Sequence, residues 1–312
     1  SAPRAVNRKS GTLGVEGHPT MLTRIHEAAS ALLPARRKPR TTVAPSERPP
    51  IRIRRPTFDV ADDAPKYFYR GEKGVTALLY ALSAVFPEGE RMFIDSVQHY
   101  RDRITDDALR QDVRAFAGQE AQHGRLHEAY NAYAQARGFD VDPISASVKE
   151  RNALLKKRMP PAARLATTAA LEHFTALLAE VLLGDEHFLD GVDRAHAELW
   201  RWHAAEEAEH KAVAFDVLDA VSGSYVTRLR SYLVVSVMFP SFTLVHTLHL
   251  MRHDGTLLDL RAHLGLLHFL FVSPGVLPKV APGWRDYFRP DFHPWSRDDR
   301  ELLARWAHAA AA

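Results

Sequence analysis

The sequence of 312 residues contains no cysteine. This absence excludes disulfides, zinc sites built from thiolates, iron–sulfur clusters and thiol catalysis. The chain also has little net charge, a formal +3, and therefore gives no reason to expect a nucleic-acid partner. A signal peptide is not recognisable at the start, which is polar and basic. A metal site in such a chain must use carboxylates and imidazoles, and 17 histidines supply the second kind.

Residues 1–50 lack the apolar periodicity of a folded element, apart from a short amphipathic stretch at 22–33. Residues 34–50 are rich in proline, arginine and threonine, which is typical of a linker. We therefore expect a disordered basic tail and linker over 1–50, with a basic tether to a membrane or an acidic partner as the alternative. Residues 51–58 alternate apolar and basic side chains and predict a short extended arm.

Four long segments have the 3.6-residue apolar period of bundle helices: 75–100, 106–137, 162–183 and 189–221. Pro87 is expected to kink the first or to restart it. Residues 139–160 are a polar connection between the second and third, and no stretch has the pattern of a strand. The order of two helices, a long crossover and two further helices predicts an all-α, ferritin-like four-helix bundle over 51–224.

Residues 225–312 are expected to add apolar helices and an aromatic strap, 287–295, to the same domain. Residues 231–251 contain no Asp, Glu, Lys or Arg, and about twenty such residues can cross a bilayer. Pro240 interrupts this run, and Pro274 breaks the next, 264–277. Helices that cover the bundle are the favoured interpretation, with a hairpin on one membrane leaflet or a true span as alternatives. The expected location is the cytoplasm, with membrane contact through 231–277 left open.

Residues 203–210 read His-Ala-Ala-Glu-Glu-Ala-Glu-His. On a helix, positions three and four apart share a face, so His203, Glu207 and His210 point the same way. The Glu-x-x-His spacing of Glu207 and His210 is that of metal ligands in dinuclear carboxylate bundles. The same spacing recurs at Glu120 and His123. Two such pairs are a much stronger signal than one.

Each pair follows a helix with one carboxylate on its core face, Glu90 in the first case and Glu172 in the second. Glu90 is preferred over Glu88, which lies in a first turn where a carboxylate merely offsets the helix dipole. Two antiparallel helices joined by a short turn bring residues about 15 positions from that turn to one height, since each residue rises about 1.5 Å. The four acids can therefore meet.

Four buried carboxylates require compensation, which two divalent cations supply. The expected cofactor is a pair of Fe ions; Mn or a mixed Fe/Mn pair stays open, and Zn is less suited to so many ligands. Glu120 and Glu207 would bridge the ions. No catalytic residue is predicted beyond the metal ligands, which are Glu90, Glu120, His123, Glu172, His203, Glu207 and His210.

Gln119 and Glu206 precede the two bridging acids. Each is expected to hydrogen-bond the free nitrogen of the histidine on the opposite helix and so to fix its tautomer. Asp95 and Asp216 are weaker candidates for this role. His127 lies one turn beyond His123 and is expected to be an interior histidine behind the ligands.

Four blocks of this sequence, 86–91, 119–123, 170–176 and 200–215, resemble in order the bacterial family labelled predicted metal-dependent hydrolases. The resemblance extends over roughly residues 50–295 and implies a metal-dependent protein. The spacing of His203, Glu207 and His210 is also similar to that of di-iron arylamine N-oxygenases, which use three histidines and four carboxylates. This second similarity concerns the ligands alone and implies a chemistry, not a substrate.

The favoured function is a di-iron oxidoreductase that activates O2 and oxidises an organic, lipophilic small molecule with electrons from an external donor. The alternative is a binuclear hydrolase with a metal-bound hydroxide as nucleophile. Metal storage, or a metal with only a structural role, is the non-enzymatic interpretation. A homodimer is left open.

Overall fold

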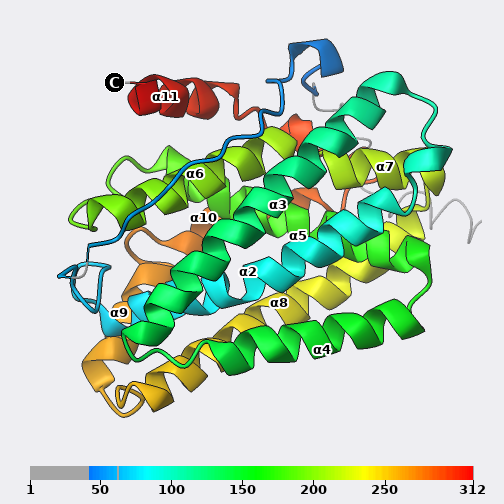
Figure 1. Ribbon diagram of the computed structural model, residues 1–312. Helices are drawn as coiled ribbons and strands as arrows, with labels where there is room; N and C mark the ends of the chain where they lie inside the picture. Colours follow the sequence, from blue (N-terminus) through cyan, green and yellow to red (C-terminus); the bar gives the residue numbers. More distant parts are fainter. Residues whose placement is uncertain (1–41, 62, 312) are drawn as a thin grey trace, which may run out of the picture. The chain divides into compact units, whose positions relative to one another are not determined.

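The chain divides into two units, residues 1–40 and 41–312. The computed structural model describes residues 42–61 and 63–311, all within the second unit (Figure 1). Those residues form helices α2 to α11 and three short 3-10 helices, and they contain no strand beyond one isolated bridge between Tyr69 and Val192. The all-α prediction is confirmed. Of the tail and linker expected over 1–50, residues 1–41, with the stretch 22–33, lie outside the described residues, and residues 42–50 include the 3-10 helix Pro45–Glu47.

Four helices form a bundle: α2 (Lys73–Gln98), α3 (Asp107–Ala136), α5 (Pro161–Gly184) and α6 (Arg194–His210). Helix α2 packs against α3 and α5, and α6 packs against α5 and α3. Local chemistry fixes two of the starts, because the carboxylates of Asp106 and Asp193 accept hydrogen bonds from the first free backbone N–H groups of α3 and α6. Helix α2 continues through Pro87, so the proline neither ends nor restarts it.

The fourth predicted helix differs from the single rod expected over 189–221. It begins at Arg194, ends at His210 and is followed after two residues by α7 (Val213–Val221). At the break, Lys211 is buried, and its Nζ donates to Asp299 Oδ2 at 2.5 Å and to the carbonyl of Arg297 at 2.6 Å. The segment 189–193 forms a turn in which Gly191 has a φ of +69°. The break between α6 and α7 is thus accompanied by contacts between Lys211 and residues far away in the sequence.

The prediction of a polar connection over 139–160 is wrong, because most of this segment is helix α4 (Asp142–Arg158). This helix packs on α2 with only Ile144 and Val148 buried. Ser145 donates to the carbonyl of Ala84, and Asn152 donates to the carbonyl of Glu88. So narrow an apolar stripe does not produce a clear helical period in the sequence.

Three further helices cover α2 and α5: α8 (Tyr225–His253), α9 (Leu260–Phe271) and α10 (Val276–Asp286). Helices α5 and α8 have the length and composition of membrane spans, and α9 with α10 would pass as one broken span. Helix α5, however, carries Glu172 into the bundle, and two thirds of its apolar window is buried inside the protein. Only a fifth of the corresponding window of α8 is buried.

The aromatic segment after α10 packs on the bundle. Tyr287 stacks on Tyr232 of α8 with ring centroids 3.9 Å apart, and Trp295 lies under Lys211. Helix α11 (Arg300–Ala311) then packs against α6 and α5. The extended segment 51–61, drawn in blue, crosses α6 on the side of the bundle where α11 lies (Figure 1). Its Arg52 carbonyl accepts from Gln119 of α3 at 3.0 Å.

A buried histidine in this core predicts an acid sensitivity. His196 stacks on Phe68 with centroids 4.1 Å apart, and its Nδ1 lies 2.5 Å from the Tyr130 hydroxyl. Burial lowers the pKa of His196 to about 4, although Asp193 partly offsets this. Because the folded protein binds the proton more weakly than the unfolded chain, the stability from this group is present above the ordinary pKa and is lost as pH falls.

We expect the free energy of unfolding of the wild type to fall by about 2 kcal/mol more between pH 7 and pH 5 than that of His196→Asn. Chemical denaturation at several pH values measures this difference. His99→Asn changes an exposed histidine and should keep the wild-type slope. Equal slopes for the wild type and His196→Asn would contradict the assignment.

Candidate metal centre

The side chains predicted as metal ligands come from all four bundle helices and meet in the bundle core. Helix α2 contributes one of them, α3 two, α5 one and α6 three. Each is at most 4% exposed, which excludes the interpretation of these acids as solvated surface charges. They are Glu90, Glu120, His123, Glu172, His203, Glu207 and His210.

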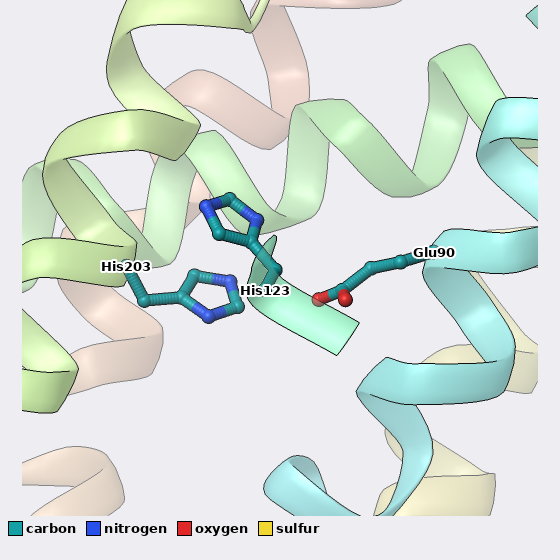
Figure 2. A group of neighbouring side chains, drawn as sticks. All are labelled: Glu90, His123 and His203. Carbon is teal, nitrogen blue, oxygen red and sulfur yellow. The ribbon is translucent and has the colours of Figure 1, made fainter. Parts of the chain in front are cut away.

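Their donor atoms form three groups, in each of which the atoms lie within 4.8 Å of one another. The first contains Glu90, His123 and His203, and Figure 2 shows its carboxylate directed toward the two imidazoles. The second contains Glu120, His123 and Glu207. The third contains Glu120, Glu172 and His210. The groups share residues, so they describe one continuous centre with two ends.

Two carboxylates lie between these ends. Glu207 Oε1 is 3.4 Å from His123 Nδ1, and Glu207 Oε2 is 3.7 Å from His210 Nε2. Glu120 belongs to both carboxylate-rich groups, and its Oε1 is 3.1 Å from His210 Nε2. This placement is the one that bridging carboxylates between two ions would need.

Hydrogen bonding tests whether the centre fits a metal. Both carboxylate oxygens of Glu90, Glu120 and Glu172 are buried without a hydrogen bond from any described residue. The same holds for His123 Nδ1 and His210 Nε2, the nitrogens that face the acids. Buried polar atoms in native proteins almost always have partners, and a cluster of orphaned acceptors is the expected environment of cations. The donor set therefore fits two divalent ions.

The electrostatics of the centre agree with this fit. Burial raises the pKa of Glu90 and of Glu172 well above the ordinary value, and neighbouring acids add to the effect. Burial would lower the pKa of His123 and His210, but the surrounding carboxylates hold both well above the ordinary value. The local field thus favours positive charge, which a proton or a metal ion can supply.

The two hydrogen bonds expected behind the histidines are present. His123 Nε2 lies 3.2 Å from Glu206 Oε2, and His210 Nδ1 lies 2.8 Å from Gln119 Oε1. Gln119 Oε1 can only accept, so His210 carries its proton on Nδ1 and leaves Nε2 free to ligate. Glu206 accepts in the same way from His123 Nε2, which leaves His123 Nδ1 free to ligate.

His127 lies behind His203 and outside the three groups of donor atoms. Its Nε2 is 2.7 Å from His203 Nδ1, and its Nδ1 is 2.9 Å from Ser83 Oγ. Ser83 in turn donates to Asn131 Oδ1 at 2.6 Å. Burial and the neighbouring imidazoles hold the pKa of His127 well below the ordinary value, so this histidine stays neutral.

The two acids that were weaker candidates for a hydrogen bond to the site histidines lie elsewhere. Asp95 pairs with Lys156 and Arg164 at 2.7 Å each. Asp216 pairs with Arg48 at 2.8 Å and with His293 at 2.7 Å. Both therefore neutralise cations away from the site histidines, and their suggested role behind the ligands is wrong.

Glu88 was the rival of Glu90 as the acid of the first helix. It pairs with Arg91 at the surface, whereas Glu90 points into the core (Figure 2).

Sequence reasoning missed a layer of residues behind Glu206 and Gln119. Arg54, on the extended segment 51–61, donates from Nη1 to Glu206 Oε1 at 3.1 Å and from Nη2 to Glu209 Oε1 at 2.6 Å. Glu209 Oε2 accepts from Gln119 Nε2 at 2.8 Å. A single guanidinium is thus connected to His123 through Glu206, and to His210 through Glu209 and Gln119. The sequence features that could have indicated this layer were the basic residues of 51–58 and the additional acid Glu209 beside Glu206 and Glu207.

Removing this guanidinium is expected to weaken metal binding. In Arg54→Ala the buried carboxylates of Glu206 and Glu209 lose their cation, and the orientation of both site histidines is relaxed. Loss of such supporting groups lowers metal affinity about 10–100-fold. Competition with a chromophoric chelator measures the change. Arg55→Ala removes an exposed arginine next in sequence and should bind metal as the wild type does; identical affinities for both variants would contradict the connection.

A cavity of about 510 Å³ adjoins one side of the centre. His203 and Glu207 are part of its wall, and the rest comes from α2, α5, α6, α8, α9 and α10, with residue 188 before α6. Leucines and phenylalanines dominate the lining, for example Leu178, Leu248 and Phe239. Its titratable residues, among those the structure describes, are His203, Glu207 and His263. The space therefore suits an apolar molecule with one end at the metal centre.

Searches of curated proteins and of solved structures found no significant match to this chain. The family described as "Predicted metal-dependent hydrolase" matches residues 52–298. The match includes the extended segment with Arg54, the four bundle helices and all the residues that line the cavity. The chain therefore belongs to the predicted metal-dependent hydrolase family.

Proposed function

We propose that this protein is a dinuclear non-haem iron oxidoreductase that uses O2 to oxidise a lipophilic organic molecule. The observation that carries the proposal is the cavity: an apolar space ends at a centre of four carboxylates and three imidazoles. Hard carboxylates with imidazoles suit iron or manganese. Two such ions, when bound, supply the redox chemistry, and an external donor supplies electrons.

The proposed ligands divide between two positions. Glu90, His123 and His203 would hold one ion, and Glu172 and His210 the other, with Glu120 and Glu207 between them. The negative charge of the four acids is then balanced by two dications. His203 Nδ1 and His127 Nε2 lie within hydrogen-bond distance, so one of these two nitrogens carries the proton that they share. This contact fixes the ring of His203 at the cavity wall.

The cavity wall also bears on the substrate. A hydrolase needs groups that bind a carbonyl or phosphoryl oxygen and that protonate a leaving group. Among the described residues that line the cavity there is no lysine, arginine or aspartate. The apolar wall instead excludes water and orients a hydrocarbon chain against the centre, which suits oxidation of an unactivated lipophilic molecule.

A metal-dependent hydrolase is the second candidate, and the description of the family supports it. Both candidates are metal-dependent enzymes and share the same centre. They differ in the metal required and in the need for O2, so one preparation can separate them.

The test is to load the purified protein with ferrous iron, reduce it anaerobically and admit O2. The proposal expects two iron ions per chain, a near-ultraviolet band of the oxidised di-iron centre, and O2 consumption stimulated by a long-chain alcohol or amine. Glu172→Ala is the control and should lose the band. If zinc-loaded protein cleaves ester or phosphodiester probes while the iron form consumes no O2, the hydrolase is correct and the proposal fails.

A further inference from the structure

Helix α8 has one face that covers the bundle and one that faces outward. Tyr232, Leu250 and Met251 are fully buried against the protein. The outward side chains follow a helical period and are half or more exposed. The stretch 231–251 that bears them contains no charged residue. They are Leu233, Val234, Val237, Met238, Leu244 and Val245.

Helix α9 presents a second row of exposed apolar residues, Leu264, Leu267 and Phe271, each about half exposed. We call these three and the six of α8 the apolar face. Isolated exposed apolar residues are ordinary, but a contiguous set marks an interaction surface.

The cavity connects the two rows. Leu244 of α8 and Leu267 and Phe271 of α9 line the cavity and are also exposed, at 51%, 51% and 55%. Leu277 of α10 also lines the cavity and is 41% exposed. The mouth of the cavity therefore opens within the apolar face, so a lipophilic molecule can enter from an apolar surface.

Arginines mark both ends of the outward side of α8. Arg230 and Arg252 lie on the same helical face as Val234, Val237 and Val245, at spacings of three, four or seven residues. Both are exposed, and neither forms an ion pair with a carboxylate of the described residues. Arg261, at the start of α9, is exposed and unpaired in the same sense. Unpaired cations around an apolar surface complement anionic lipid headgroups.

We propose that the apolar face docks on an anionic lipid bilayer with α8 lying in the plane of the surface, and that an acyl chain enters the cavity from the leaflet. The docking stands independently of the metal chemistry; that the acyl chain belongs to the substrate rests on the proposed function. A true span is disfavoured, because α8 would have to leave α2 and α5 and uncover Tyr232, Leu250 and Met251.

A second copy of the chain is the main rival for this face. A protein seated across α8 and α9 would close the mouth of the cavity, since Leu244, Leu267 and Phe271 belong to both. A bilayer instead continues the apolar medium up to the mouth. The geometry thus favours lipid over a protein partner.

Flotation of the full chain with vesicles tests the docking. The wild type should float with vesicles of phosphatidylglycerol and phosphatidylcholine, and less with pure phosphatidylcholine or at high salt. Val237→Asp should reduce the bound fraction about tenfold, because an aspartate must then enter the interface. Arg230→Gln and Arg252→Gln should each reduce binding to the anionic vesicles about fivefold.

Leu154→Asp is the matched control, since Leu154 is an apolar residue of α4 exposed at 44%, outside the apolar face. It should float as the wild type does. The proposal is overturned if the wild type does not float, or if Leu154→Asp and Val237→Asp lose binding equally. A dimer in light scattering that Val237→Asp dissociates, without flotation of the wild type, would assign the face to a second copy instead. Unchanged circular dichroism shows that the variants are folded.

A fluorescent acid, 1-pyrenedecanoic acid, tests the entry of a chain. Leu178→Trp fills the cavity and should weaken binding of this probe about tenfold while leaving flotation unchanged. Equal probe binding in both proteins would overturn the cavity as the chain site. Metal-free protein should still float, so flotation without any O2 reaction of the iron form would leave the docking standing while the proposed oxidase fails.

Discussion

Replacing Glu172 with glutamine is expected to reduce the bound metal to about half or less and, at the same time, to stabilise the metal-free protein. Glu172 is fully buried, and neither of its oxygens has a hydrogen bond from a described residue. Without an ion, burial makes the charged form so costly that the pKa of this carboxyl is raised well above its ordinary value. A neutral amide of nearly equal shape removes that cost, which we expect to be about 1–3 kcal/mol.

These two effects have opposite signs, which makes the measurement sharp. Elemental analysis gives the metal content, and thermal unfolding after dialysis against a chelator gives the stability of the metal-free form. Glu88→Gln is the matched control, because Glu88 lies two residues from Glu90 but pairs with Arg91 at the surface; it should change neither quantity appreciably. Full metal content in Glu172→Gln would remove this residue from the ligand set.

Removing the metal from the wild type is expected to lower the midpoint of thermal unfolding by about 10–20 °C. An ion present at a hundredfold excess over its dissociation constant contributes about 2.7 kcal/mol, and two ions about twice that. In a domain of this size each kcal/mol shifts the midpoint by about 2–4 °C. All four bundle helices contribute to the candidate centre, so two bound ions would connect the whole core.

Differential scanning calorimetry with and without a chelator measures this shift, and re-addition of ferrous iron should restore it. Glu172→Gln should show a clearly smaller response to the chelator, because it begins with less metal and a less strained core. A wild-type midpoint that does not respond to chelation would mean that the acids in the core are stabilised by something other than ions.

The candidate centre was accessible to sequence reasoning because its proposed ligands obey local rules. His203, Glu207 and His210 share a helical face by spacing alone, and Glu120 with His123 repeats the pattern. Glu172 is conspicuous because an acid in an apolar helix needs a compensating charge. These arguments use neighbours within two turns, where backbone geometry leaves little freedom.

Other features depend on contacts far apart in sequence. Helix α4 was missed because Ile144 and Val148 are its only buried residues. The division of the fourth helix after His210 accompanies the burial of Lys211 against Asp299. Arg54 was missed for a related reason: it is more than 150 residues from Glu206 and Glu209. No periodicity links an extended segment to a helix that it crosses.

Local spacing along the chain was thus sufficient to identify four helices, to place an acid on the inner face of each, and to pair histidines with two of them. The backbone repeat of a helix dictates such facts before any tertiary contact forms. Packing alone decided which side of the centre adjoins an apolar cavity, which arginine supports its histidines, and which face of α8 is left uncovered. Those features depend on how separate helices pack against one another. The apolar period of one helix does not specify its shape complementarity to segments that are distant in the sequence.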